Sequence, residues 1–253
     1  MMRGMSSTDI AARLGALRAS TADLLTGLDA SQWADTDMRA PSALPDWTRG
    51  HVLTHICRNA DGIAATLGGA LRGEIVARYP NGPAGRAADI EAGAGRSAGE
   101  LITDVRESAA RLDRLFGAVL DASGWELRTE EDKPARVWIT GRWREVEIHR
   151  IDLLGTYKAS DWPAGFVDYL LPKLAAADEL APRLFRTTRI EVAHDGSTTT
   201  DLGGTVWTVS PSEAETDPEI VAGPDWAVLA WLIGRPALAA PALSSTPELG
   251  RWS

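Results

Sequence analysis

Apolar residues recur at three- and four-residue spacing in several long segments of the first 160 residues, which is the period of an amphipathic helix. The pattern is clear over residues 8–28. A second helix is expected to begin near Thr48, a suitable N-cap, and to include the sequence HVLTHICRNADGIAATLGGALRG. Further helices are expected over residues 99–120 and 135–157. Four helices of this length predict an up-and-down or crossover bundle.

The segment between the second and third of these helices, residues 80–99, is rich in Gly, Ala and Pro. This composition predicts a long loop with short helical turns.

The pattern changes after about residue 160. A helix is expected over residues 166–180, and alternating apolar residues then predict strands in RTTRIEVAHDG, GGTVWTVS and PEIVAG. Asp195-Gly196 is a hairpin signal, and GPDWAVLAWLIGR is an amphipathic helix with Pro224 at its start. We therefore predict an α+β chain: a four-helix bundle over residues 1–160 and a small α+β domain over 161–253.

Composition limits the classes of function. The formal net charge is −9, with 44% hydrophobic and 24% charged residues. This acidic balance argues against a broad surface for nucleic acid or an anionic membrane, although local arginines can still bind a small anion. No apolar run approaches the roughly 20 residues of a membrane span, and the start MMRGMSSTDIAARL lacks the apolar region of a signal peptide. We expect a cytoplasmic protein, in which the single Cys57 excludes an intramolecular disulfide.

Two pairs of metal-ligating residue types occur at i,i+4 spacing: His51 with His55, and Glu145 with His149. Side chains at this spacing leave one face of a helix with Cβ atoms about 5–6 Å apart, which suits two ligands of one ion. A ligand from a facing helix would complete a set of two histidines and one carboxylate, with open positions for water or substrate. The spacing alone is equally compatible with surface or capping pairs.

Several residues near these pairs have competing interpretations. Asp152 could orient a histidine ligand or be an exposed helix acid, and Asn59 could line a cleft or pack inside the bundle. Cys57 lies two positions from His55 and so points away from the ligand face, which predicts a buried residue rather than a nucleophile. His194, at the predicted hairpin turn, is expected to be structural or exposed.

The segment LPDWTRGHVLTHICRNADGI, followed about 85 residues later by RWREVEIHRIDL, closely resembles the mycothiol-dependent maleylpyruvate isomerase family, within the DinB-like metalloenzyme superfamily. WLIGR near the C-terminus matches a third, weaker element. The resemblance implies a DinB-like four-helix bundle followed by a small α+β domain. It also implies that His55, Glu145 and His149 bind zinc or another divalent metal, whereas His51 matches a histidine outside the ligand set.

The same resemblance implies roles for other residues. Arg86, in NGPAGRAADI, and Arg235, in WLIGR, match arginines that face substrate carboxylates or the thiol cofactor, and we count both as candidate catalytic residues. Arg235 and Asn59 are the candidate cofactor-binding residues.

The resemblance implies an enzyme whose partners are a small-molecule substrate and a low-molecular-weight thiol, mycothiol, in a monomer or homodimer. The mycothiol thiolate would add to a conjugated cis double bond, the resulting single bond would rotate, and loss of the thiol would leave the trans isomer. If the thiol stays attached, the same site would be that of a thiol S-transferase. The sequence does not decide between isomerisation and transfer. A non-catalytic metal-bound regulatory module is the third alternative, which the three-ligand set disfavours because such modules can dispense with the carboxylate.

Overall fold

A computed structural model describes residues 6–193, 205–210 and 218–250. The chain divides into two compact units, Met1–Thr156 and Tyr157–Ser253. Each unit has its own core, and each is described separately below.

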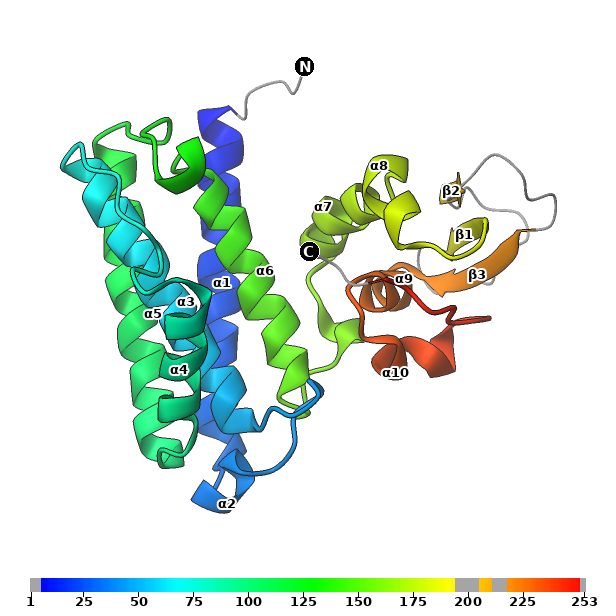
Figure 1. Ribbon diagram of the computed structural model, residues 1–253, viewed down its shortest axis with the longest axis horizontal. Helices are drawn as coiled ribbons and strands as arrows, with labels where there is room; N and C mark the ends of the chain where they lie inside the picture. The colour runs from blue at the N-terminus through cyan, green and yellow to red at the C-terminus, as the bar shows by residue number, and fades with distance from the viewer. Residues whose placement is uncertain (1–5, 194–204, 211–217, 251–253) are drawn as a thin grey trace. The chain divides into compact units, whose positions relative to one another are not determined.

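The first unit is built on four long helices that lie side by side (Figure 1). Helix α1 packs against α6 and α5, and helix α3 packs against α5 and α6, so the four helices surround one core. Their bounds are α1 Ser7–Ser31, α3 Arg49–Leu71, α5 Ala98–Asp121 and α6 Val137–Asp152, with the short α2 Asp35–Met38 preceding α3. The predicted bundle is confirmed, although the fourth helix is shorter at both ends than the apolar pattern indicates.

Side-chain caps fix where these helices begin. The Thr48 hydroxyl accepts a hydrogen bond from the His51 backbone N–H at the start of α3. The Ser97 hydroxyl accepts from the Glu100 N–H at the start of α5, while the Glu100 carboxylate accepts from the Ser97 N–H. Such caps satisfy amide donors that have no partner inside the helix. The Thr48 cap fixes the first residue of α3 and therefore the positions of His51 and His55 along it.

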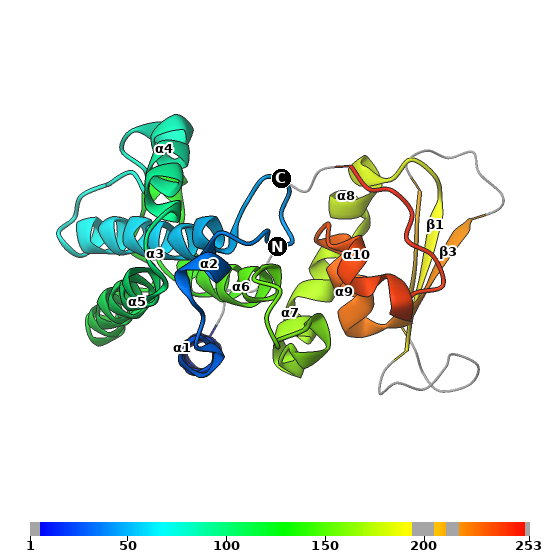
Figure 2. The same cartoon turned by 90° about the horizontal axis from the view of Figure 1, so that it is seen from below.

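Helix α4, Gly82–Ala94, occupies most of the segment that we predicted to be a loop, so that prediction was wrong. Small residues bring α4 close to α3, as Figure 2 shows from below. A Cβ on Gly50 would lie 2.1 Å from the Ala94 carbonyl oxygen, and one on Gly93 would lie 2.5 Å from a Thr54 methyl. Glycine is therefore required at both positions for α3 and α4 to approach each other closely, although glycine-rich sequence is also typical of loops.

The second unit combines short helices with a three-stranded sheet. Strand β1, Thr188–Ala193, is central: it pairs antiparallel with β2, Thr205–Val209, and parallel with β3, Glu219–Pro224. Helix α9, Asp225–Leu232, follows β3 directly and packs on β1 and β3. These elements confirm the predicted α+β class.

Two details of this unit differ from expectation or fall outside the description. The helix expected over residues 166–180 is two helices, α7 Ala164–Leu174 and α8 Ala177–Leu180. A further short helix, α10, spans Pro236–Ala239. His194 and the Asp195-Gly196 turn lie outside the described residues.

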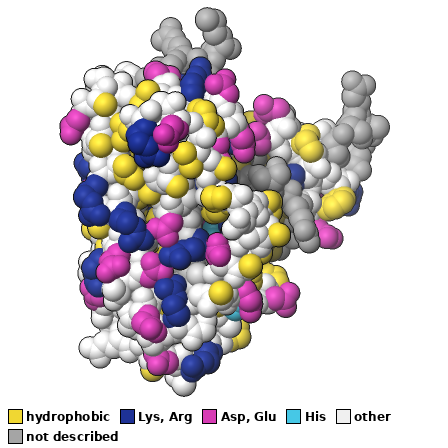
Figure 3. Space-filling view, turned by 60° about the vertical axis from the view of Figure 1, so that its left-hand side comes forward, with side chains coloured by type: hydrophobic (Ala, Val, Ile, Leu, Met, Phe, Trp, Pro, Cys, Tyr) yellow, Lys and Arg dark blue, Asp and Glu magenta, His cyan; other side chains and the backbone are white. Residues whose placement is uncertain are grey.

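Acidic and basic side chains alternate on the face of the molecule seen in Figure 3. Ion pairs join α3 to α5 and the segment before it: Asp104 lies 2.9 Å from Arg58 and 2.8 Å from Arg96, and Arg111 lies 2.6 Å from Asp61. Half-exposed pairs of this kind stabilise a fold weakly, so the apolar core must supply most of the bundle's stability. None of the described helices combines the length and the hydropathy needed to cross a membrane.

The bundle core yields a stability prediction. Leu53 of α3 is fully buried, whereas Leu120 of α5 is 41% exposed. Leu53→Ala should lower the free energy of unfolding by about 2–5 kcal/mol, because it removes buried methyl groups and leaves a cavity. Leu120→Ala is the matched control, and we expect a change within about 0.5 kcal/mol. Urea unfolding of both variants tests this; equal effects would contradict the assigned core.

Candidate metal centre

Helices α3 and α6 bring three potential metal ligands together. His55 projects from α3, and Glu145 and His149 project from successive turns of α6. One ligand atom from each of the three residues lies within 4.8 Å of the others. His55 Nε2 is 2.8 Å from Glu145 Oε2 and 3.0 Å from His149 Nε2, and the remaining Glu145 Oε2–His149 Nε2 distance is 3.4 Å.

These distances fit a metal centre. Zinc is bound by histidine nitrogen and carboxylate oxygen at about 2.0–2.2 Å, so neighbouring ligand atoms of a tetrahedral ion lie roughly 3.3 Å apart. The three edges observed here are within about half an ångström of that length. The two ring nitrogens lie 3.0 Å apart, and a carboxylate oxygen lies beside them. The residues present therefore fit a divalent metal with at least one open position.

Asp152 supports this arrangement from behind His149. Its carboxylate lies 2.8 Å from His149 Nδ1, and the side chain is fully buried. A carboxylate on Nδ1 fixes the ring orientation and leaves Nε2 to face the site, as commonly seen behind metal-binding histidines. Of the two roles considered for Asp152, the structure excludes the exposed helix acid.

Burial and hydrogen bonding set the charges at the centre. Burial lowers the pKa of His55 to about 4, although its hydrogen bond with Glu145 opposes this, so the ring is neutral at pH 7. Burial alone would raise the pKa of Glu145, but hydrogen bonds with His149 and His55 outweigh it and hold that pKa well below its usual value. Burial alone would lower the pKa of His149, but hydrogen bonds with the Asp152 and Glu145 carboxylates outweigh it, so that pKa is raised above its usual value.

Arg86, on α4, contacts the other ring nitrogen of His55. Its Nη2 donates to Nδ1 over 2.7 Å, so the ring proton lies on Nε2 and is directed at Glu145. A metal on Nε2 would require the other tautomer, with the proton on Nδ1, and Arg86 could then no longer donate to that nitrogen. The Arg86 guanidinium also lies over the Tyr79 ring, 5.4 Å from its centroid.

A cavity of about 210 Å³ adjoins Arg86, which is one of its lining residues. Tyr79, Asp61 and Arg58 are among the other lining residues, so the cavity combines an aromatic face with charged groups. Arg86 links this cavity to the ligand cluster, because it lines the cavity and also contacts His55.

His51 lies outside the ligand cluster. Its Nδ1 accepts from the Thr48 backbone N–H over 3.1 Å, and its Nε2 lies 3.1 Å from Glu91 on α4. Both ring nitrogens are thus engaged in capping α3 and in holding α4. Trp47 stacks on the His51 ring and meets the His55 ring edge-on.

Asn59, expected to bind the thiol cofactor, lies in the bundle interior. The side chain is 2% exposed, and its Oδ1 accepts from Arg142 Nη1 over 3.0 Å. These contacts account for its burial as part of the bundle packing and give no support to a cofactor-binding role.

Arg142 is a buried polar residue next to the candidate centre that is not among the residues predicted from the sequence. It lies on α6 and is buried, and it also donates to the Ile56 carbonyl oxygen over 2.8 Å. Its position three residues before Glu145 places both on one face of α6, and that spacing was the signal available in the sequence.

Arg235 belongs to the second compact unit, where it follows α9 and donates to the Ile233 carbonyl oxygen over 2.9 Å. The structure therefore places Arg86, but not Arg235, within the unit that carries the ligand cluster.

The bundle, its facing histidines and glutamate, and the small α+β unit define the class: a DinB-like four-helix protein with a C-terminal appendage. A family model described as the mycothiol maleylpyruvate isomerase N-terminal domain matches residues 14–154. The chain therefore belongs to the mycothiol maleylpyruvate isomerase family.

Two solved structures share the fold. They are a mycothiol-dependent maleylpyruvate isomerase and its histidine-to-alanine mutant, with TM-scores of 0.76 and 0.78. Each is 22% identical in sequence, and each match covers 96% of this chain and 97% of the other. A comparison with curated proteins found no match.

The environment of Cys57 yields a prediction about reactivity. Its side chain is fully buried, and burial, together with the nearby Asp104 carboxylate, raises the pKa of the thiol to about 12. Because the thiolate is the reactive form, the folded protein should be modified by iodoacetamide at pH 8 at least about tenfold more slowly than the urea-unfolded chain. Mass spectrometry measures both rates, and equal rates would contradict the assignment of Cys57 as a buried, unreactive residue.

Proposed function

We propose that this protein is a metal- and mycothiol-dependent cis–trans isomerase of the maleylpyruvate isomerase type, with His55, Glu145 and His149 as the metal ligands. The observation that carries the proposal is the convergence of three ligand atoms from α3 and α6 in a chain of this family. Two histidines and a carboxylate form a ligand set that suits zinc. The proposed partners are a small-molecule substrate and the thiol mycothiol.

A bound metal would supply a positive charge that favours the thiolate form of mycothiol at neutral pH. In the reaction, the sulfur electron pair forms a C–S bond to the conjugated cis double bond, and the π electrons move to the adjacent carbonyl oxygen as an enolate. The former double bond can then rotate. Return of the electrons expels the thiolate and leaves the trans isomer, so the thiol is recovered unchanged.

The residues of this chain have separate tasks in that reaction. Asp152 holds the His149 ring so that Nε2 faces the site. Arg86, which lies beside His55, would pair with a substrate carboxylate or the enolate oxygen as negative charge develops. Arg235 stays a proposed second cation for the substrate or the thiol.

The metal ligands are tested by the zinc content of purified variants. His55→Ala and Glu145→Ala should each lose about one zinc per chain, because removal of one of three protein ligands weakens binding by orders of magnitude. His51→Ala is the matched control on the same helix and should keep its zinc. Plasma mass spectrometry gives the metal content; unchanged zinc in His55→Ala would disprove this ligand set.

The reaction is tested with maleylpyruvate and mycothiol. We expect its absorbance to change only when the thiol is present, and the thiol to be recovered in full at the end. Stoichiometric thiol loss with a heavier conjugate would instead identify a thiol S-transferase. Absence of turnover together with a co-purifying protein would indicate the regulatory module.

The role of Arg86 is tested by separating metal binding from turnover. Arg86→Met should lower kcat/KM by about 100-fold, the cost of a lost charge-assisted contact, while zinc content stays at one per chain. Arg86→Lys should retain part of the activity because it keeps the charge. Loss of zinc in Arg86→Met would show instead that Arg86 maintains the ligand cluster.

A further inference from the structure

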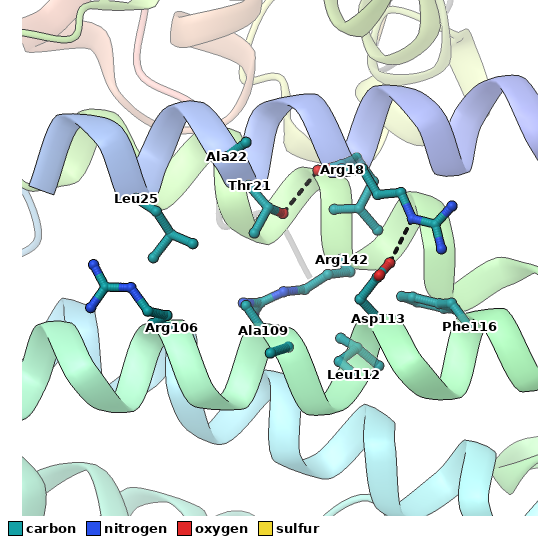
Figure 4. A pocket seen from close by; sticks show the side chains of 12 residues that line it. Arg18, Thr21, Ala22, Leu25, Arg106, Ala109, Leu112, Asp113, Phe116 and Arg142 are labelled. Carbon is teal, nitrogen blue, oxygen red and sulfur yellow. Dashed lines mark hydrogen bonds and ion pairs between the residues drawn. The ribbon is translucent and has the colours of Figure 1, made fainter. Parts of the chain in front are cut away.

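A second cavity, of about 400 Å³, lies in a groove between α1 and α5, and none of the three candidate ligands lines it. Figure 4 shows the two helices on either side, with side chains from both directed into the space. The walls are mostly apolar, formed by Leu17, Leu25, Leu112 and Phe116 and by small alanines. The volume falls within the roughly 300–1,000 Å³ typical of small-molecule sites.

Arg142 of α6 forms the floor of this groove. Figure 4 shows its side chain reaching into the space between α1 and α5. The residue is 2% exposed, yet its Nη2 has no hydrogen-bond partner within the described part of the chain. Nη1, in contrast, donates to the Ile56 carbonyl and to Asn59, so one side of the guanidinium is fixed and the other is unsatisfied.

An unsatisfied guanidinium in the interior is unfavourable, because burial removes water without supplying an acceptor. Among the described residues, no carboxylate forms an ion pair with Arg142. Glu145 attracts the guanidinium without contacting it, so a carboxylate entering the groove would provide the direct acceptor that is missing.

The charges around the groove indicate how many negative charges a ligand should carry. Two other arginines line it, and both already pair with carboxylates: Arg18 with Asp113 at 2.6 Å, and Arg106 with Asp29 at 2.7 Å. Arg142 is thus the one arginine of this lining without an acidic partner among the described residues. This arrangement favours a ligand with a single negative charge and an apolar remainder.

We propose that the groove between α1 and α5 binds a small aliphatic monocarboxylate, with its carboxylate on the Arg142 guanidinium and its hydrocarbon chain against Leu17, Leu25 and the apolar face of α5. The site is separate from the candidate metal centre in its lining residues. It is also independent of the proposed isomerase activity, because it requires neither metal nor thiol.

The probe is octanoate, titrated into the full chain and followed by saturation-transfer NMR. Octan-1-ol keeps the apolar chain but lacks the charge, and acetate keeps the charge but lacks the chain. Octanoate should bind at least about tenfold more tightly than either, because a charge-assisted hydrogen bond and the burial of several methylene groups each supply at least that factor. Equal binding of octan-1-ol would indicate an apolar surface only, and equal binding of acetate an adventitious ion only; either result overturns the proposal.

Two variants test the location. Arg142→Met should weaken octanoate binding by about tenfold or more, with circular dichroism confirming the fold. Ala109→Phe fills the groove without altering Arg142 and should abolish binding even if Arg142→Met does not fold. Ala118→Phe, at an exposed position on the same helix outside the groove, is the matched control and should bind octanoate as the unaltered chain does.

Undiminished octanoate binding by Ala109→Phe would place the ligand elsewhere and refute the proposal. Concentration-dependent dimerisation that Ala109→Phe abolishes, without any octanoate binding, would also refute it, because the occupant would then be a second copy of the chain. Zinc content in these variants reports separately on the metal centre, so failure of the groove proposal and failure of the proposed function are distinguishable.

Discussion

The close packing of α3 against α6 is the constraint on which the candidate centre depends. It brings His55 Nε2 to within 2.8 Å of Glu145 and 3.0 Å of His149, although these residues lie 90 and 94 positions from His55 in the sequence. Such proximity of two rings and a carboxylate is unfavourable in a buried site unless a proton or a metal ion occupies the space between them. The buried Asp152 carboxylate behind His149 shows that the arrangement extends beyond the three candidate ligands.

The second constraint is the approach of α4 to α3, made possible by glycines at the contact. That approach carries Arg86 to His55, so the proposed substrate-binding cation contacts a candidate metal ligand directly. Because Arg86 and a metal on His55 would favour different tautomers of the imidazole ring, metal binding at this site would be coupled to the position of Arg86. A site with this coupling would present its arginine to an anionic substrate only when the metal is in place.

The sequence predicted the bundle and the α+β class because amphipathic helices and alternating strands leave direct periodic signals. It did not predict α4, because glycines that allow helix contact have the same composition as a loop, and only tertiary packing distinguishes the two. The i,i+4 pairs indicated which helices could carry ligands, but spacing could not show that His51 caps α3 while His55 faces α6. Likewise, nothing in the local pattern showed that Asn59 and Arg142 meet inside the bundle, because that contact joins residues more than 80 positions apart.

The central claim is that one divalent metal lies among His55, Glu145 and His149. Anomalous diffraction from crystals of the zinc-loaded protein, with data collected on both sides of the zinc absorption edge, tests it most directly. One strong anomalous peak is expected about 2.0–2.2 Å from His55 Nε2, His149 Nε2 and a Glu145 carboxylate oxygen. The Arg86 guanidinium is also expected no longer to contact His55 Nδ1. A zinc-loaded crystal with no peak between these three side chains would contradict the central claim.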